Sequence, residues 1–163
     1  MDLDRLSRGE RIALIASALL FVAFFVPMWA SISAGGFGAD FNGWDGYGIL
    51  GKLALLCTLA VLVLTALRLT DVALPDMPVS RGLLLLGLSG VATLMLLLGL
   101  LVGPNDNGAD GVQGVDVDRG LMLFVGIVLA AAMTYGSYLT MQEEGTAPIG
   151  GSARPASPPP PPA

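Results

Sequence analysis

Four apolar stretches of about 20 residues, each without a charged residue in its central part, dominate the sequence. They run near residues 12–30, 47–67, 82–102 and 120–138. A helix rises about 1.5 Å per residue, so each stretch is long enough to cross the roughly 30 Å hydrocarbon core of a bilayer. The sequence therefore predicts a membrane protein with four transmembrane helices.

The composition supports a membrane protein and limits its partners. The chain has 163 residues, of which 54% are hydrophobic and only 13% are charged. This balance is too apolar for an ordinary soluble domain. The net charge of -5 argues against a nucleic-acid partner, because binding to phosphates needs a basic surface. The expected partners are the lipid bilayer and either further copies of the chain or a larger membrane complex.

Side chains that commonly carry catalysis are scarce in this chain. It has no histidine, the commonest metal ligand and the commonest general base at neutral pH. Cys57 is the only cysteine, which excludes a redox pair, and its place inside the second stretch favours a small packing residue. Pumps and proton relays usually carry ionisable residues at membrane depth, and these stretches offer none there. We therefore predict no enzymatic activity and no catalytic, cofactor-binding or metal-binding residues.

The charges around the stretches predict how the chain is threaded. The basic residues near the N-terminus and beside the second connection are Arg5, Arg8, Arg11, Arg68 and Arg81. The connections at 31–46 and 103–118 contain aspartates and no lysine or arginine. The positive-inside rule then places both termini in the cytoplasm and both acidic connections outside. Lys52 and Arg119, at outer helix ends, are expected to extend toward the interface.

Local signals divide the chain into three parts. Residues 1–11 form a cytoplasmic segment in which Ser7 and Glu10 fit a helix capping box. Residues 12–138 form the membrane domain, and its first stretch is predicted to be a span, since it is longer than a typical signal-peptide core. Residues 139–163 form a cytoplasmic tail that ends in a run of prolines and is expected to be disordered.

Aromatic residues mark the outer end of the predicted spans. Trp29, Trp44 and Tyr47 are expected to form an outer aromatic belt at the membrane interface. Phe21 and Phe25 continue a stripe from Trp29 along the first span. This stripe is interpreted as bundle core or lipid contact.

Small residues recur at helical spacing and predict where helices approach closely. The rows are Gly126, Ala130 and Thr134 in the fourth span, Ser89, Gly90 and Thr93 in the third, and Ala13 and Ser17 in the first. We interpret these rows as contacts within one all-helical four-helix bundle. A dimer interface is the alternative, because the pattern does not distinguish a neighbour in the same chain from one in a second copy.

Three motifs outside the spans resemble binding sites incompletely. Residues 35–40 match one copy of a calcium-binding repeat, which needs stacked copies, so a flexible loop is expected. Residues 106–111 start like an EF-hand but lack ligands at two positions, which leaves weak cation association by the acidic loops as a hypothesis. Residues 154–158 contain a Pro-x-x-Pro step that a polyproline-binding domain recognises, although a solvated tail is the simpler interpretation.

Three short sequences carry a resemblance to a known group of proteins. They are Leu-Ser-Arg-Gly-Glu-Arg-Ile at residues 6–12, Pro-Met-Trp at 27–29 and Trp-Asp-Gly-Tyr at 44–47. With the threading above, the chain resembles small four-helix membrane proteins of high-GC actinobacteria that have Gly/Pro/Ala-rich tails. The resemblance implies a multi-pass plasma-membrane protein of a bacterium, and it implies no catalytic or binding residues.

These observations predict a non-enzymatic interaction or accessory protein of the bacterial envelope, which assembles with itself or with a larger membrane complex. The alternative is a small channel or transporter subunit formed by oligomerisation. Its pore would be lined by the hydroxyl residues Ser17, Thr58, Thr65, Ser89, Thr93 and Thr134. Hydroxyls gathered on one face would favour the pore, and scattered hydroxyls would weaken it.

Overall fold

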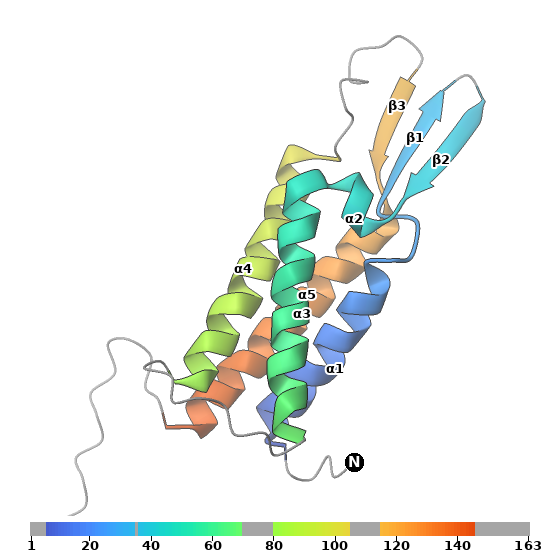
Figure 1. Ribbon diagram of the computed structural model, residues 1–163. Helices are drawn as coiled ribbons and strands as arrows, with labels where there is room; N and C mark the ends of the chain where they lie inside the picture. Colours follow the sequence, from blue (N-terminus) through green and yellow to red (C-terminus); the bar gives the residue numbers. More distant parts are fainter. Residues whose placement is uncertain (1–5, 35, 70–79, 105–114, 146–163) are drawn as a thin grey trace, which may run out of the picture.

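Four long helices form an antiparallel bundle in the computed structural model, which describes residues 6–34, 36–69, 80–104 and 115–145 (Figure 1). The helices are α1 (Arg8–Ala23), α3 (Gly48–Leu69), α4 (Arg81–Val102) and α5 (Leu121–Glu143). Helix α1 packs between α3 and α5, and α4 packs against the same two helices on the other side. The chain thus runs up and down around a ring in which spatial neighbours are antiparallel.

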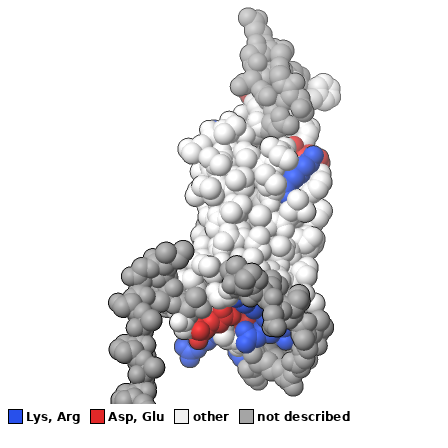
Figure 2. Space-filling model, turned by 60° about the vertical axis from the view of Figure 1, so that its left-hand side comes forward, with Lys and Arg blue, Asp and Glu red and all other residues white. Residues whose placement is uncertain are grey.

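Three of the four predicted spans are confirmed as long apolar helices. Helices α3, α4 and α5 are each long and apolar enough to cross a membrane. Large apolar side chains cover the outside of the bundle, where water would disfavour them and lipid would not. Examples are Ile15, Leu19, Val22, Val91, Leu94, Leu101 and Val128. Figure 2 shows this surface as a broad uncharged zone with charged residues at its two ends. The fold is therefore compatible with a membrane protein.

The first predicted span is wrong in its outer part. Helix α1 has 16 residues and ends at Ala23, so it is about 24 Å long. Pro27 and the residue before it disfavour a continued helix, and Met28 takes a positive φ of 90°. The chain turns here and enters a strand at Ala30. Hydropathy alone does not distinguish this turn from helix because its residues are equally apolar.

A small sheet at one end of the bundle was not predicted, so the all-helical expectation is incomplete. Strands β1 (Ala30–Ala34), β2 (Phe37–Phe41) and β3 (Val115–Arg119) form an antiparallel sheet in the order β2-β1-β3. The short helix α2 (Gly43–Gly46) follows β2 and leads into α3. The sheet joins the two acidic connections of the sequence, and the flexible loop expected at residues 35–40 is largely the hairpin strand β2.

Trp29 lies in the core where the sheet meets the helices, and not in the interfacial belt that the sequence predicts. Its side chain is fully buried and stacks on Phe24, with ring centroids 4.7 Å apart. The indole Nε1 donates a hydrogen bond of 2.7 Å to the carbonyl oxygen of Ala23, the last residue of α1. Trp44 remains partly exposed, and the Lys52 Nζ lies 5.4 Å from the centre of its ring.

Some of the predicted small-residue rows make contacts within this chain. Gly126 faces the Trp29 ring, and Thr134 shares a hydrogen bond of 2.9 Å with Thr93 across α4 and α5. Ala13 packs against Gly136 of α5. Gly90 differs, since a side chain built there would meet no atom within 4 Å. The rows at Gly126 and Ala13 therefore support the bundle interpretation.

Gly136→Ala is expected to destabilise the bundle by about 1 to 3 kcal/mol, because it overpacks the contact between α1 and α5. A Cβ atom on Gly136 would lie 2.6 Å from the Ala13 amide nitrogen and 2.8 Å from the Gly9 carbonyl oxygen. Both are backbone atoms, so the helices themselves must move apart. Detergent unfolding followed by helical circular dichroism measures the loss.

Gly87→Ala is the matched control for this change. Gly87 is exposed on α4, and a Cβ there would meet nothing within 4 Å. Alanine also favours helix over glycine by up to about 1 kcal/mol, so the control should be neutral or slightly stabilising. Equal stability of the two variants would contradict close backbone packing of α1 on α5.

Candidate functional site

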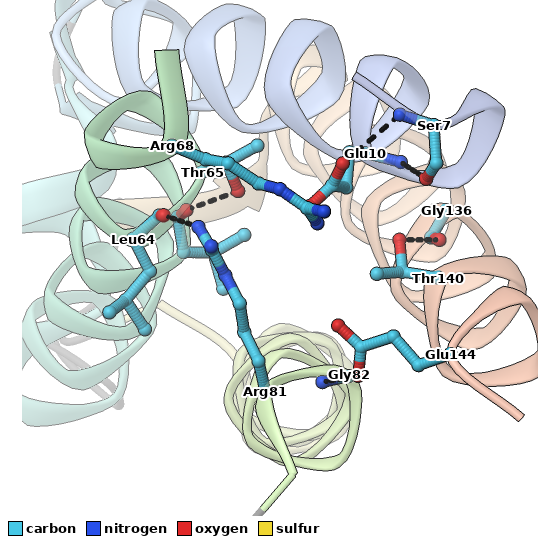
Figure 3. A network of polar contacts seen from close by, with 11 residues as sticks. Ser7, Glu10, Leu64, Thr65, Arg68, Arg81, Gly82, Gly136, Thr140 and Glu144 are labelled. Carbon is cyan, nitrogen blue, oxygen red and sulfur yellow. Dashed lines mark hydrogen bonds and ion pairs between the residues drawn. The ribbon is translucent and has the colours of Figure 1, made fainter. Parts of the chain in front are cut away.

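The bundle end opposite the sheet holds a network of polar contacts that connects all four long helices (Figure 3). We call this set of residues the polar network. Its members are Ser7, Glu10, Leu64, Thr65, Arg68, Arg81, Gly82, Gly136, Thr140 and Glu144. They come from the start of α1, the end of α3, the start of α4 and the end of α5.

Glu10 lies at the centre of the polar network and its side chain is fully buried. One carboxylate oxygen, Oε2, accepts a hydrogen bond of 3.0 Å from the Ser7 amide, and the Ser7 hydroxyl accepts one from the Glu10 amide. This confirms the predicted capping box. The other oxygen, Oε1, forms an ion pair with Arg68 Nη1, which connects α1 with α3.

Arg81 and Glu144 connect the remaining helices. The Arg81 Nη2 donates to the carbonyl oxygen of Leu64 in α3. The Gly82 amide, in the first turn of α4, donates a hydrogen bond of 2.8 Å to Glu144 Oε2. A carboxylate at this place also interacts favourably with the positive end of the α4 helix dipole. The polar network therefore links α3 to α4 and α4 to α5.

The polar network consists of an ion pair and hydrogen bonds that hold helices together. Its charged groups are guanidinium and carboxylate, which pair and donate or accept hydrogen bonds. Thr65 and Thr140 bond to carbonyl oxygens of their own helices, Val61 and Gly136. Among the residues that the structure describes, no three histidine, cysteine, aspartate or glutamate side chains gather as metal ligands would.

Four of the six hydroxyl residues proposed to line a pore face the inside of the bundle. The side chains of Ser17, Thr58, Thr65 and Ser89 are fully buried. Their hydroxyls donate to backbone oxygens three or four residues earlier on the same helix. A pore between protomers needs polar groups on the outer surface of each protomer. This placement gives the channel alternative no added support, and that alternative stays a prediction.

The other candidate residues and motifs named in the sequence analysis lie in different parts of the chain. Cys57 is half-buried in α3 and packs against the core, as its interpretation expects. Asp40 belongs to β2 and lies opposite Ser31 of β1. The incomplete EF-hand at residues 106–111 and the Pro-x-x-Pro step at 154–158 lie outside the described residues.

Sequence reasoning missed the buried pair of Glu10 and Arg68, although one signal for it existed. The predicted threading places Glu10, Arg68 and Arg81 at the cytoplasmic ends of three spans. Charges at the same membrane depth on neighbouring helices are candidates for pairing.

Comparisons of the chain with protein-family models, curated proteins and solved structures found no match.

Proposed function

We propose that the protein is a non-enzymatic interaction or accessory protein of a bacterial plasma membrane. The observation that carries this proposal is the ordered sheet beyond one end of the apolar bundle (Figure 1). At the opposite end, Glu10, Arg68, Arg81 and Glu144 are engaged in contacts between helices. The sheet extends beyond the helices with exposed residues on it, so it can contact another protein outside the membrane.

The orientation of the protein in the membrane is part of the proposal. Arg8, Arg68 and Arg81 lie at the end that holds the polar network, and the sheet end contains Asp40 and Asp118. The positive-inside rule supports a cytoplasmic polar network and an outer sheet. Both termini then lie in the cytoplasm, with α1 entering the membrane beside α5.

One labelling experiment tests both the orientation and the interaction role. In a Cys57→Ser background, Ser33→Cys places one thiol on the exposed sheet and Glu143→Cys places one at the opposite end. A membrane-impermeant maleimide that carries a photocrosslinker should label the Ser33 site in intact bacteria. It should reach the Glu143 site only after the cells are permeabilised. Illumination should then yield crosslinked adducts from the Ser33 site.

Two results would contradict the proposal. Labelling at Glu143 in intact cells would reverse the orientation. If neither labelled site crosslinks to a second copy of the chain or to another envelope protein, the interaction role is wrong. The unlabelled Cys57→Ser protein is the control for reaction at other side chains.

A further inference from the structure

The sheet has one acidic face. In the antiparallel register, Ser31 of β1 lies opposite Asp40 of β2 and Asp118 of β3, and Ser33 lies opposite Asp116. Residues paired across neighbouring strands share a face, as do residues two apart along one strand. Asp40, Asp116 and Asp118 therefore project from the same face, and all three are exposed.

The opposite face of the sheet is apolar except for Arg119, and it is only partly covered. At its base, Ala30 is buried and lies close to Gly46 of α2. Farther from the bundle, Ala39 is exposed and Phe37 is 85% exposed. Phe37 begins β2 at the end of the hairpin that points away from the helices (Figure 1). Exposed aromatic side chains of this kind are enriched where proteins bind each other.

The outer edge of β2 carries fewer charges than the outer edge of β3. Since β1 is central, β2 and β3 each have one side without a strand partner among the described residues. Charges discourage strand addition at an edge, and β3 has three of them, Asp116, Asp118 and Arg119. Strand β2 has one charged residue, Asp40, between two phenylalanines.

We propose that the β2 edge binds an extended segment of a partner protein, which adds a fourth strand and alternates basic with apolar side chains. This inference rests on the outer placement of the sheet in the proposed function. Alternate residues of an added strand point to opposite faces. Its basic side chains would lie beside Asp40 on the acidic face, and its apolar side chains would lie beside Phe37 and Ala39.

The charges of β2 favour a different protein over a second copy of this chain. Strand β2 contains Asp40 and no basic residue, so two β2 edges would offer each other no opposite charge. The strands also extend away from the bundle, roughly along the helices (Figure 1). Two copies inserted the same way would therefore bring their β2 edges together parallel, which is slightly less stable per residue than antiparallel pairing.

The test uses the full chain in lipid nanodiscs and a fluorescent nine-residue peptide of alternating lysine and valine. Fluorescence anisotropy should show binding that weakens as salt increases. Asp40→Lys and Phe37→Ser should each weaken binding by about fivefold, the effect of one cross-strand pair. Asp45→Lys is the matched control, because Asp45 is exposed in α2 and lies off the sheet. It should leave the affinity unchanged.

The order of residues in the peptide provides the second control. The control peptide has the lysines in one block and the valines in another, so its charge is the same. As a strand it cannot place all its lysines on one face and all its valines on the other, so it should bind more weakly. Equal binding of the two peptides, or an equal loss in Asp45→Lys and Asp40→Lys, would overturn strand addition. Crosslinked adducts at Ser33 without peptide binding would overturn it while the proposed interaction role remained.

Discussion

Replacing Trp29 with alanine is expected to lower the free energy of unfolding by roughly 3 to 5 kcal/mol, the range for deleting a large buried aromatic side chain. The indole is fully buried and stacks on Phe24 at an angle of 16°. It also donates a hydrogen bond to the Ala23 carbonyl at the end of α1, which accepts one from the Val26 amide as well. Alanine removes the stacking and the Nε1 hydrogen bond and opens a cavity.

The large effect also follows from where Trp29 lies in the chain. Its amide donates to Phe41 at the end of β2, and its carbonyl oxygen accepts from the Gly120 amide at 2.8 Å and the Tyr47 hydroxyl at 3.2 Å. These bonds join the turn after α1 to the sheet and to the starts of α3 and α5. Losing the side chain that fixes this turn should weaken the attachment of the sheet to the bundle.

Unfolding in mixed detergent micelles, followed by helical circular dichroism, measures this loss. Trp29→Phe keeps an aromatic ring against Phe24 and removes the Nε1 hydrogen bond, so a smaller loss of about 1 to 3 kcal/mol is expected. Trp44→Ala is the control, because Trp44 is 38% exposed and is the other tryptophan of the chain. Its effect should stay below about 1 kcal/mol. Equal losses in Trp29→Ala and Trp44→Ala would contradict the buried role of Trp29.

Helices α3, α4 and α5 were predictable because a helix long and apolar enough to cross a membrane is recognised from the hydropathy of the sequence alone. A span needs about 20 apolar residues, and this requirement does not depend on the neighbouring helices. Hydropathy also led to the wrong end for the first helix, which stops at Ala23. Residues 24–30 are as apolar as a span, but Phe24 and Trp29 are apolar because they fill the protein core. Pro27 was the local signal that the helix stops earlier.

The sheet was not predicted because its pairing joins distant parts of the chain. Residues 115–118 alternate valine and aspartate, which is a strand pattern, but four residues are a weak signal on their own. Their partner β1 belongs to the other acidic connection. In the sequence, the aspartates of both connections indicate a side of the membrane. In the structure, Asp40, Asp116 and Asp118 also define one face of a sheet.

Local spacing predicts the polar network only within one helix. The capping box of Ser7 and Glu10 is a local pattern of spacing, and the structure contains it. The pair of Glu10 and Arg68 depends on α1 lying beside α3, which the sequence does not specify. Arg68 was therefore interpreted only as a signal of orientation, whereas in the structure it also compensates a buried charge.

Replacing Arg68 with methionine is expected to destabilise the protein by roughly 3 kcal/mol, the lower end of the range for breaking a buried ion pair. Glu10 is fully buried, so its carboxylate would lose this guanidinium without gaining water. Glu10→Gln should cost less. The Arg68 side chain is 45% exposed, so water can hydrate it when the carboxylate is removed. This difference between the two partners is the central expectation.

A double-mutant cycle measures that difference directly. Arg68→Met combined with Glu10→Gln should be more stable than Arg68→Met alone, because no buried carboxylate remains without its partner. Arg8→Met, at an exposed residue of the same helix end, should change stability by no more than about 0.5 kcal/mol. A larger loss from Glu10→Gln than from Arg68→Met would contradict the interpretation. Because methionine keeps much of the aliphatic volume of arginine, the loss measures the unpaired charge more than a cavity.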